Sequence, residues 1–296
     1  MNNKIKPIIT VGIVTHNRRE ELMLSIRSVY NQGLDNIEIL VVDNNSEDGT
    51  MEALQKEFPS VRIIRLEENL GCPGGRNYIY DYARGEYIIN LDDDGFLESD
   101  TVKKVIKTFE SNPKIGIIAM RQCYPDEEIE PYRDGKDFSR EVGIFRGGVS
   151  AFRSAMLRET GYYPHNFFFY KEEEDLALRA LERGWKIIFH PGIIMRHPRQ
   201  NRSDRILEEG DYYLFRNPLL VVINNFPGRY LWQYLVGRII SCGLISLKRK
   251  TFRQYLHAVR DVIRALPKAM KNRSPCRKRT IQKYLELRKK SSCVFS

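Results

Sequence analysis

Three consecutive carboxylates follow a short apolar run near the middle of this chain. Residues 88–91 (IINL) read as a buried strand, and Asp92, Asp93 and Asp94 come directly after it. Along an extended strand Asp92 and Asp94 point to one side and Asp93 to the other. Two carboxylates on one side can hold Mg²⁺ or Mn²⁺ and leave the other coordination positions to phosphate oxygens and water. The spacing is therefore typical of a metal clamp for a diphosphate.

Other interpretations of this stretch explain less of it. A helix start accounts for Ser99 as a cap, but not for three carboxylates whose mutual repulsion and burial cost free energy. A calcium loop would need a bidentate Glu where Thr101 stands. The sequence DDDGFL also resembles the nucleophile motif of haloacid-dehalogenase-type phosphatases. In that family, however, the motif opens the first strand, and here Phe96 replaces the Thr that follows its Gly.

A second group of acids stands at the start of a strongly helical pattern. It consists of Glu172, Glu173, Glu174 and Asp175. Acids in a first helical turn suit the helix dipole, so a solvated helix start is one interpretation. A carboxylate held near the metal clamp would instead serve as a general base. His197, after the last predicted strand, is either a further metal ligand or an ordinary histidine.

The elements that must position these side chains alternate between strands and helices. Helical patterns separate five continuous apolar runs, at 7–15, 37–43, 61–66, 86–92 and 114–120. Such runs predict a parallel α/β sheet. Ligands of these sheets bind at the carboxyl ends of the strands, so residues 15–18, 43–46 and 92–94 should surround one crevice.

The pattern weakens after the fifth run. Residues 121–148 are polar and rich in turns, which predicts a ribbon or loop insertion. Helices are then expected at 153–160 and 172–184, and a final strand at 186–190.

The charge of the chain is unevenly distributed. Its 48 Lys/Arg and 38 Asp/Glu give a formal charge of +10, yet residues 237–296 carry 17 Lys/Arg and two Asp/Glu, which leaves the rest mildly acidic. This argues against a general nucleic-acid-binding protein and fits one that meets an anionic surface at one end. The five cysteines show no CxxC pair, so neither a disulfide framework nor a zinc site is expected. The first apolar run looks like a strand and not a signal peptide, which predicts a cytoplasmic protein.

The C-terminal third reads as helical to the end. We expect an α/β domain at 1–204 and a helical, basic region at 205–296. The most apolar part, 230–247, contains Gln233 and Arg238 and is short for a membrane span, which needs roughly 20 apolar residues. An amphipathic helix in a membrane interface, followed by basic clusters that attract anionic lipid, is the favoured interpretation. The alternative is a helix packed on the core with a solvated basic face.

Five segments in a fixed order carry a resemblance to a known family. They are VGIVTHNRRE, ILVVDNNSEDGT, NLGCPGGRN, NLDDDGFL and FFFYKEEEDLALRALERG. Between residue 8 and the region of residue 200 the chain resembles the family 2 inverting glycosyltransferases of the GT-A fold, and NLGCPGGRN is similar to the rhamnosyltransferase branch. The resemblance implies an α/β fold with a mostly parallel sheet, and metal-dependent transfer of a sugar from a nucleoside diphosphate to a hydroxyl group.

The resemblance also implies contacts with the nucleotide-sugar. The first βα turn and the end of the second strand would hold base and ribose, through Thr15, Asn17, Arg18, Asp43 and Asn45. Gly71 and Gly74 would allow close approach of the backbone, and Arg76 would supply a permanent positive charge. Asp92 and Asp93 would contact the donor.

Metal binding and catalysis fall to the remaining acids and the histidine. Asp94 and Asp92, with His197, would hold Mn²⁺ or Mg²⁺. EEEDL stands where the family has EDxDL. When Asp175 is matched to its last acid, Glu172 falls on the family's Glu and Glu173 on its catalytic Asp. The catalytic candidates are therefore Glu173, Glu172 and Asp175. The chain departs from the family here, because the base would be a longer Glu with Glu174 beside it.

These features predict a glycosyltransferase that uses a UDP- or dTDP-sugar. The acceptor would be a glycan or a polyprenyl-linked sugar, in bacterial surface-polysaccharide synthesis. The basic C-terminus predicts peripheral attachment to the anionic inner face of the cell membrane, and no nucleic-acid partner is expected. Two other functions remain to be tested, a haloacid-dehalogenase-like phosphatase and a non-catalytic nucleotide-sugar-binding protein.

Overall fold

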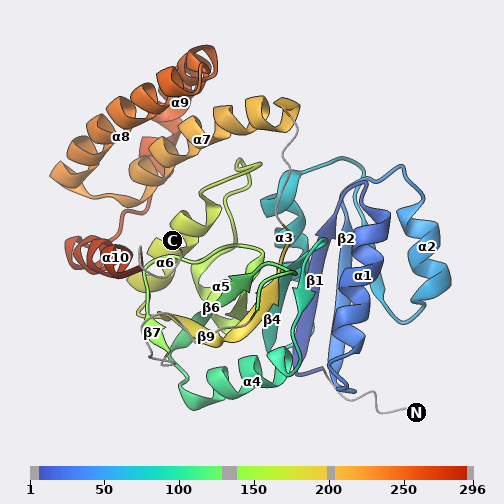
Figure 1. Cartoon of the computed structure of the whole chain (residues 1–296). Coiled ribbons are helices and arrows are strands. Elements are labelled where there is room, and N and C mark those ends of the chain that lie inside the picture. Colours follow the sequence, from blue (N-terminus) through green and yellow to red (C-terminus); the bar gives the residue numbers. More distant parts are fainter. Residues whose placement is uncertain (1–6, 129–138, 199–203, 292–296) are drawn as a thin grey trace.

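The computed structural model describes residues 7–128, 139–198 and 204–291 (Figure 1). The strands are β1 (Ile9–Thr15), β2 (Ile37–Asp43), β3 (Arg62–Arg65), β4 (Tyr87–Asp92), β5 (Phe96–Leu97), β6 (Ile115–Cys123), β7 (Arg140–Glu141), β8 (Val149–Arg153) and β9 (Lys186–Arg196). The helices are α1 (Arg19–Tyr30), α2 (Thr50–Glu57), α3 (Gly71–Tyr82), α4 (Thr101–Ser111), α5 (Ser154–Thr160), α6 (Glu172–Glu182), α7 (Asp204–Asn225), α8 (Gly228–Lys248), α9 (Phe252–Asn272) and α10 (Lys278–Ser291).

One mixed sheet forms the centre, in the order β3-β2-β1-β4-β8-β6-β9-β5, with β7 paired to β9. The first four strands in this order are parallel, as predicted. β8 lies antiparallel between β4 and β6, whereas β9 runs parallel to β6. We did not predict β8. Its five buried residues, VSAFR, lead directly into α5, and so short a run has no period that distinguishes a strand from a helix start.

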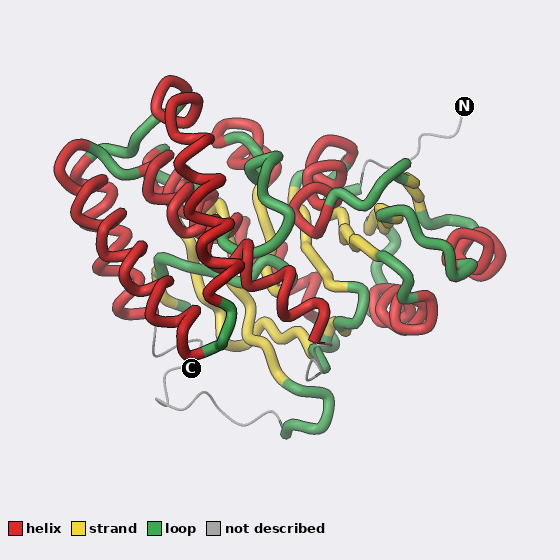
Figure 2. The backbone as a smooth tube through the Cα atoms, turned by 90° about the horizontal axis from the view of Figure 1, so that it is seen from above, coloured by secondary structure: helices red, strands yellow, loops and turns green. Residues whose placement is uncertain are grey.

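The sheet is buried on both faces, which gives three layers (Figure 2). In β2, Ile39 and Val41 pack with α1, α2 and α4 on one face, while Leu40 and Val42 pack with α3, α5 and α6 on the other. This alternation follows from the two-residue period of a strand. Burial on both faces explains why the strands read as continuous apolar runs.

The C-terminal helices form as the sequence predicts, and they pack against the α/β part. Leu219 of α7, Val262 of α9 and Tyr284 of α10 belong to the same hydrophobic cluster as Leu176 of α6. A second, smaller cluster joins Phe215 of α7, Cys242 of α8 and Ala258 of α9. No helix among the described residues is long and apolar enough to cross a membrane.

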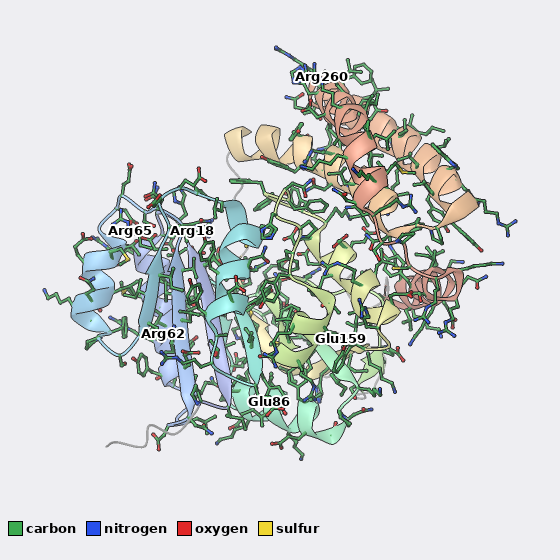
Figure 3. The ribbon with its side chains drawn as sticks, turned by 180° about the vertical axis from the view of Figure 1, so that it is seen from behind. Arg18, Arg62, Arg65, Glu86, Glu159 and Arg260 are labelled. Atoms are coloured by element: carbon green, nitrogen blue, oxygen red, sulfur yellow. The ribbon has the colours of Figure 1, made fainter. Side chains whose placement is uncertain are left out.

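The carboxyl ends of the parallel strands meet at one edge of the sheet. Thr15 pairs with Asp43 in register, and Val14 pairs with Asp92. Viewed from behind, Arg18 and Arg65 lie at this upper edge, while Glu86, which precedes β4, lies at the opposite one (Figure 3). The polar side chains that follow the strands are thus gathered on the side over which α7 passes (Figure 1).

Candidate active site

A cavity of about 1050 Å³ opens at this carboxyl edge. The predicted residues in its lining are Thr15, Arg18, Gly71, Arg76, Asp92, Asp93, Asp94, Glu172, Glu173 and His197. Five other predicted residues are not in the lining, namely Asn17, Asp43, Asn45, Gly74 and Asp175. The cavity is large enough for a nucleotide-sugar, since small-molecule sites commonly measure about 300–1,000 Å³.

Two carboxylates and an imidazole face one another in the cavity. Asp92 ends β4 and Asp94 follows in the turn, while His197 comes directly after β9. The Nε2 of His197 lies 3.0 Å from Oδ1 of Asp94 and 3.5 Å from Oδ2 of Asp92. One ligand atom from each residue lies within 4.8 Å of the other two. This donor set suits a divalent cation, which such carboxylate oxygens and an imidazole nitrogen can hold together.

The electrostatics of this cluster favour positive charge. Burial opposes the charged form of His197, but hydrogen bonds with Asp92 and Asp94 outweigh it and raise the pKa of His197 to about 10. Burial likewise opposes ionisation of both carboxyls, yet Arg76 and His197 hold the pKa of Asp92 below its usual range, and His197 does the same for Asp94. The carboxylates thus remain charged and available as ligands.

Two arginines donate hydrogen bonds to the three aspartates. The buried Arg76 donates to Oδ1 of Asp92 at 2.7 Å. Arg18 donates to Oδ2 of Asp94 at 2.7 Å and reaches Oδ1 of Asp93 at 3.4 Å. Burial raises the pKa of Asp93 to about 7 even though Arg18 opposes it. Asp93 is not among the three residues whose ligand atoms converge. The strand alternation is not the reason, because β4 ends at Asp92 and both Asp93 and Asp94 lie in the turn that follows.

Close backbone approach is needed at four glycines. Gly71 has φ +73°, and a Cβ there would collide with the backbone of Phe168. At Gly74 a Cβ would meet Leu70, so this residue serves helix packing and not the cavity. Gly147 and Gly148, which the sequence did not single out, are more important for the site. A Cβ on Gly147 would meet Arg76 and Glu173, and one on Gly148 would overlap the carboxylate of Asp92.

The three consecutive glutamates of α6 point to different surroundings, because successive residues of a helix are turned by about 100°. Glu173 is half-buried in the cavity, where its Oε1 accepts the N–H of Gly147 at 3.1 Å. Glu172 lies deeper, 3.9 Å from Arg76, and its Oε2 is buried without a hydrogen-bond partner. Burial, followed by the charge of Glu173, raises the pKa of Glu172.

Glu174 turns away from the cavity and joins α6 to the C-terminal helices. Its Oε1 accepts the hydroxyl of Tyr284 at 2.8 Å and lies 3.2 Å from Arg238 and 3.3 Å from Arg288. Burial favours the neutral form, but the charges of Lys171, Arg238 and Arg288 outweigh it and lower the pKa of Glu174. This position excludes Glu174 as a base acting in the cavity.

A stability prediction follows for Glu174→Gln. Its folded-state pKa is depressed, so its charge stabilises the fold above its unfolded pKa of about 4.3 and ceases to do so as pH falls through the folded value. We expect the variant to be less stable than the wild type by about 1–3 kcal/mol at pH 7, with the difference shrinking below about pH 4. Urea unfolding at both pH values measures it. Glu110→Gln, at an exposed site on α4, is the control, and a difference that does not change with pH would contradict the assignment.

Asp175 has structural contacts in place of the catalytic role expected from the sequence. Its Oδ2 binds Arg179 at 2.7 Å, and its Oδ1 accepts the side-chain amide of Asn225 at 2.7 Å. Arg179 in turn donates to the carbonyls of Thr160 and Tyr162. These bonds hold α6 against its neighbours and leave Asp175 outside the cavity.

The predicted base-binding loop is built around buried side chains. Asp43 is fully buried, where its Oδ1 accepts the N–H of Ser46 at 2.9 Å and its Oδ2 has no hydrogen-bond partner. Asn17 joins two loops, since its N–H donates to Ser46 and its side-chain oxygen accepts the N–H of Glu47. Asn45 adopts φ +67°, which an asparagine tolerates. Asn17 and Asn45 thus shape the loop behind the cavity.

An aromatic wall, consisting of Phe168, Phe169, Tyr170 and Tyr213, closes the other side of the cavity. The ring of Phe168 stacks on Tyr213 of α7 at 5.5 Å. Tyr170 has φ +64° and the next residue φ +72°, an unfavourable conformation for both. Asn217 of α7 holds this loop by donating to the carbonyls of Phe169 and Tyr170 at 2.7 and 2.9 Å. The run FFFY was visible in the sequence, but nothing there indicated that residues beyond 204 would complete the site.

Comparison with known proteins agrees with this architecture. The model of glycosyl transferase family 2 matches residues 10–173. Over 105 residues the chain is 31% identical to the putative teichuronic acid biosynthesis glycosyltransferase TuaG of Bacillus subtilis, which covers 34% of this chain and 42% of that protein. The match with two further glycosyltransferases, one from Bacillus subtilis and one from Haemophilus influenzae, covers 29% and 37% of their lengths, so this chain spans less than half of these relatives.

Solved structures show the same fold. Residues 1–349 of TarS from S. aureus, in complex with UDP-GlcNAc, align with a TM-score of 0.64 at 18% identity, over 88% of this chain and 82% of that one. The mannosyltransferase PcManGT from Pyrobaculum calidifontis, in complex with GDP-Man and Mn²⁺, aligns with a TM-score of 0.60 at 19% identity, over 88% and 76%. The fold is GT-A. Because the family match begins in β1 and ends in the first turn of α6, it includes the elements that carry Asp92, Asp94 and Glu173, and this chain belongs to glycosyl transferase family 2.

Proposed function

We propose that this glycosyltransferase moves a sugar from a nucleoside diphosphate to an acceptor hydroxyl, with inversion, and that it requires Mn²⁺ or Mg²⁺. The observation that carries the proposal is the cluster of Asp92, Asp94 and His197 in the same cavity as Glu173. These residues offer a cation site and a carboxylate base, the two groups that such a transfer needs.

The cation, when bound by Asp92, Asp94 and His197, supplies charge that stabilises the departing diphosphate. Arg76 and Arg18 keep the aspartates oriented and add positive charge to the same part of the cavity. PcManGT, whose complex contains Mn²⁺, supports a divalent ion in this fold. Asp93 lines the cavity outside the group of Asp92, Asp94 and His197, so it is available to the donor.

Glu173 is the proposed base. It lies in the cavity with its carboxylate anchored by the Gly147 N–H, so it can accept the proton of an acceptor hydroxyl as that oxygen attacks the anomeric carbon. Glu172 is less suited, because its carboxylate is buried beside Arg76 with one oxygen that has no hydrogen-bond partner. Transfer by this route breaks the bond between the anomeric carbon and the diphosphate and forms the new glycosidic bond on the opposite face.

A UDP- or dTDP-sugar is the favoured donor. Thr15 lines the cavity at the end of β1. The neighbouring Asp43 lies behind the lining, and its Oδ2, 3.9 Å from Arg65, has no hydrogen-bond partner. An acid at this position suits the imide hydrogen of uracil or thymine. TarS, crystallised with UDP-GlcNAc, supports a uridine nucleotide, and the NLGCPGGRN segment favours a rhamnosyl donor.

The acceptor is proposed to be a growing surface polysaccharide or a polyprenyl-linked sugar at the inner face of the cell membrane. The description of TuaG as a teichuronic acid biosynthesis enzyme supports the polysaccharide. The 17 Lys/Arg between residues 237 and 296 support an anionic carrier or surface.

Thermal unfolding with UDP, dTDP and GDP, each with and without Mn²⁺, tests the donor site. We expect one nucleotide to stabilise the protein, and only with the metal, by about 2.7 kcal/mol at a hundredfold excess over Kd, or several degrees in Tm. Mn²⁺ alone and nucleotide alone are the controls. If no nucleotide stabilises the protein with the metal, or if all of them do so equally without it, the metal-dependent site is wrong.

A further inference from the structure

The exposed large hydrophobic side chains gather on two adjacent helices. Fourteen large hydrophobic side chains are exposed among the described residues. Ten of them belong to α8 and α9, with exposed fractions from 40% to 63%. On α8 they are Trp232, Val236, Ile240, Leu244, Ile245 and Leu247, and on α9 they are Phe252, Leu256, Ile263 and Met270. Soluble proteins rarely expose so many apolar side chains together without a partner.

Most of these side chains form one row on each helix. On α8 the row runs from Trp232 in steps of four residues to Leu244, opposite a buried row that includes Leu235 and Cys242. On α9 the row runs from Phe252 in steps of four and seven residues to Met270. Steps of four and seven keep side chains on one helical face. The rows are therefore continuous stripes.

The two stripes lie on the same side of the helix pair. The helices meet where the hydroxyl of Tyr255 donates to the carbonyl of Ile239 at 3.1 Å, and where Gly243 faces the Tyr255 ring. On the helical projections Ile239 of α8 and Tyr255 of α9 fall between the buried row and the exposed row, and Gly243 falls at the near edge of the exposed row. The exposed rows therefore flank the contact line on its outer side. Figure 1 shows α8 and α9 at the outer edge of the molecule, beyond α7.

A row of cations borders the apolar stripe on α9. Arg253, Arg264 and Lys271 each come one residue after a member of the stripe, Arg260 lies on the same face four residues before Arg264, and all four are exposed. Arg260 and Arg264 also lie 3.2 and 3.8 Å from Asp261. Figure 3 shows Arg260 pointing away from the body of the protein. The end of α8 and the turn after it add Lys248 and Lys250, whereas Arg249 is paired with Asp211 of α7. An apolar stripe with a cationic border, and Trp232 beside it, is the pattern of helices that lie in the headgroup region of a bilayer.

We infer that the outer face of α8 and α9 is a docking surface for a bilayer that contains anionic lipid. A second copy of the chain is a poorer partner, because pairing would bring two cationic rows together, whereas anionic headgroups complement them. The inference extends the proposed function, since α8 also contacts Glu174 of α6 through Arg238 and so ties the docked face to the helix that carries Glu173. The sequence pointed to 230–247 and to the basic clusters that follow it, whereas the structure adds the apolar stripe of α9 and the cations beside it.

Vesicle binding tests the surface without reference to turnover. The chain has two tryptophans, so Trp185→Phe leaves Trp232 as the only indole reporter. We expect this variant to co-sediment with vesicles of phosphatidylcholine and phosphatidylglycerol and to shift its emission to shorter wavelength. We expect it to bind pure phosphatidylcholine at least tenfold more weakly and to be released by high salt.

Two variants then locate the surface. Ile240→Gln with Ile263→Gln, and Arg253→Gln with Arg260→Gln, should each weaken binding at least about tenfold, while Leu24→Gln on α1, which is 50% exposed, should not. All of these variants should transfer sugar to a soluble acceptor as the wild type does.

Two results would overturn the docking surface. One is a wild type that transfers sugar without binding anionic vesicles, and the other is that the variants bind these vesicles as well as the wild type. A dimer that the Ile240→Gln, Ile263→Gln variant abolishes would assign the face to a second copy instead. A wild type that binds vesicles but shows no transfer would refute the proposed reaction and leave the docking surface standing.

Discussion

Replacement of Asp92 by Asn should reduce sugar transfer about a thousandfold, or roughly 4 kcal/mol of transition-state stabilisation. Asp92 faces His197 and Asp94 in the proposed cation site, and it also accepts a hydrogen bond from Arg76. Asn keeps the size of the side chain and can still accept from Arg76, so the loss should come from the missing ligand charge. Steady-state transfer assays over a range of Mn²⁺ concentrations measure it.

Asp100→Asn is the matched control for Asp92→Asn. Asp100 precedes α4, its side chain is 60% exposed, and it contacts Lys103 and not the cavity. Its φ of +59° suits Asn as well as Asp. We expect this variant to match the wild type. Full activity of Asp92→Asn, with an unchanged requirement for the cation, would contradict the proposed role of Asp92.

Glu173→Gln should lower kcat by about a hundredfold to ten-thousandfold, the usual contribution of a general base. Gln can still accept the N–H of Gly147, so the loop should keep its position and the KM for the donor should change little. The measurement is a comparison of kcat and KM with the metal saturating. An equal fall in donor affinity would show that the side chain binds the donor and does not take the proton.

Glu172→Gln is the decisive comparison for Glu173→Gln, because the two residues are adjacent and the EEED sequence departs from the family pattern that assigns their roles. Glu172 is buried beside Arg76, and its replacement should disturb Arg76 more than it removes a base. The ranking of kcat values among Glu172→Gln, Glu173→Gln and the exposed-site control Glu110→Gln identifies the base. A larger fall in kcat for Glu172→Gln would transfer the role to Glu172.

The same variants separate the other functions considered from the sequence. A phosphatase would hydrolyse phosphomonoesters, lose that activity in Asp92→Asn and be insensitive to Glu173→Gln. Membership of glycosyl transferase family 2 argues against it, and so does the position of DDDG after the fourth strand in chain order. A non-catalytic binding protein would bind a nucleotide with Mn²⁺ and show no turnover in the wild type.

Much of the fold could be predicted because its signals are local. The strands are buried on both faces and therefore appear as apolar runs, and the ends of parallel strands must share an edge. That rule was sufficient to bring Thr15, Arg18 and Asp92 into one cavity. Position 197 was predicted from the family pattern, and the structure places it beside Asp94 because β9 ends at the same edge.

The different roles of neighbouring acidic residues could not be predicted from the sequence in the same way. Three residues of the same type, Glu172, Glu173 and Glu174, stand side by side in the sequence. Helix geometry and the packing of α6 place Glu172 in a buried pocket beside Arg76, Glu173 in the cavity and Glu174 in contact with Tyr284. Asp175 fits the family motif equally well, yet Asn225, fifty residues away, and Arg179 bind its carboxylate.

The sequence by itself determined the order of the first strands and helices, from β1 to β4 and α4, together with the family pattern and the acids that end β4 and begin α6, because periodicity and composition act over a few residues. Only the tertiary structure decided which atoms line the cavity. Gly148 leaves room for Asp92, and Asn217 of α7 holds the loop before α6, although both come from distant parts of the chain. The packing of side chains that are far apart in the sequence sets these contacts, and no local pattern encodes them.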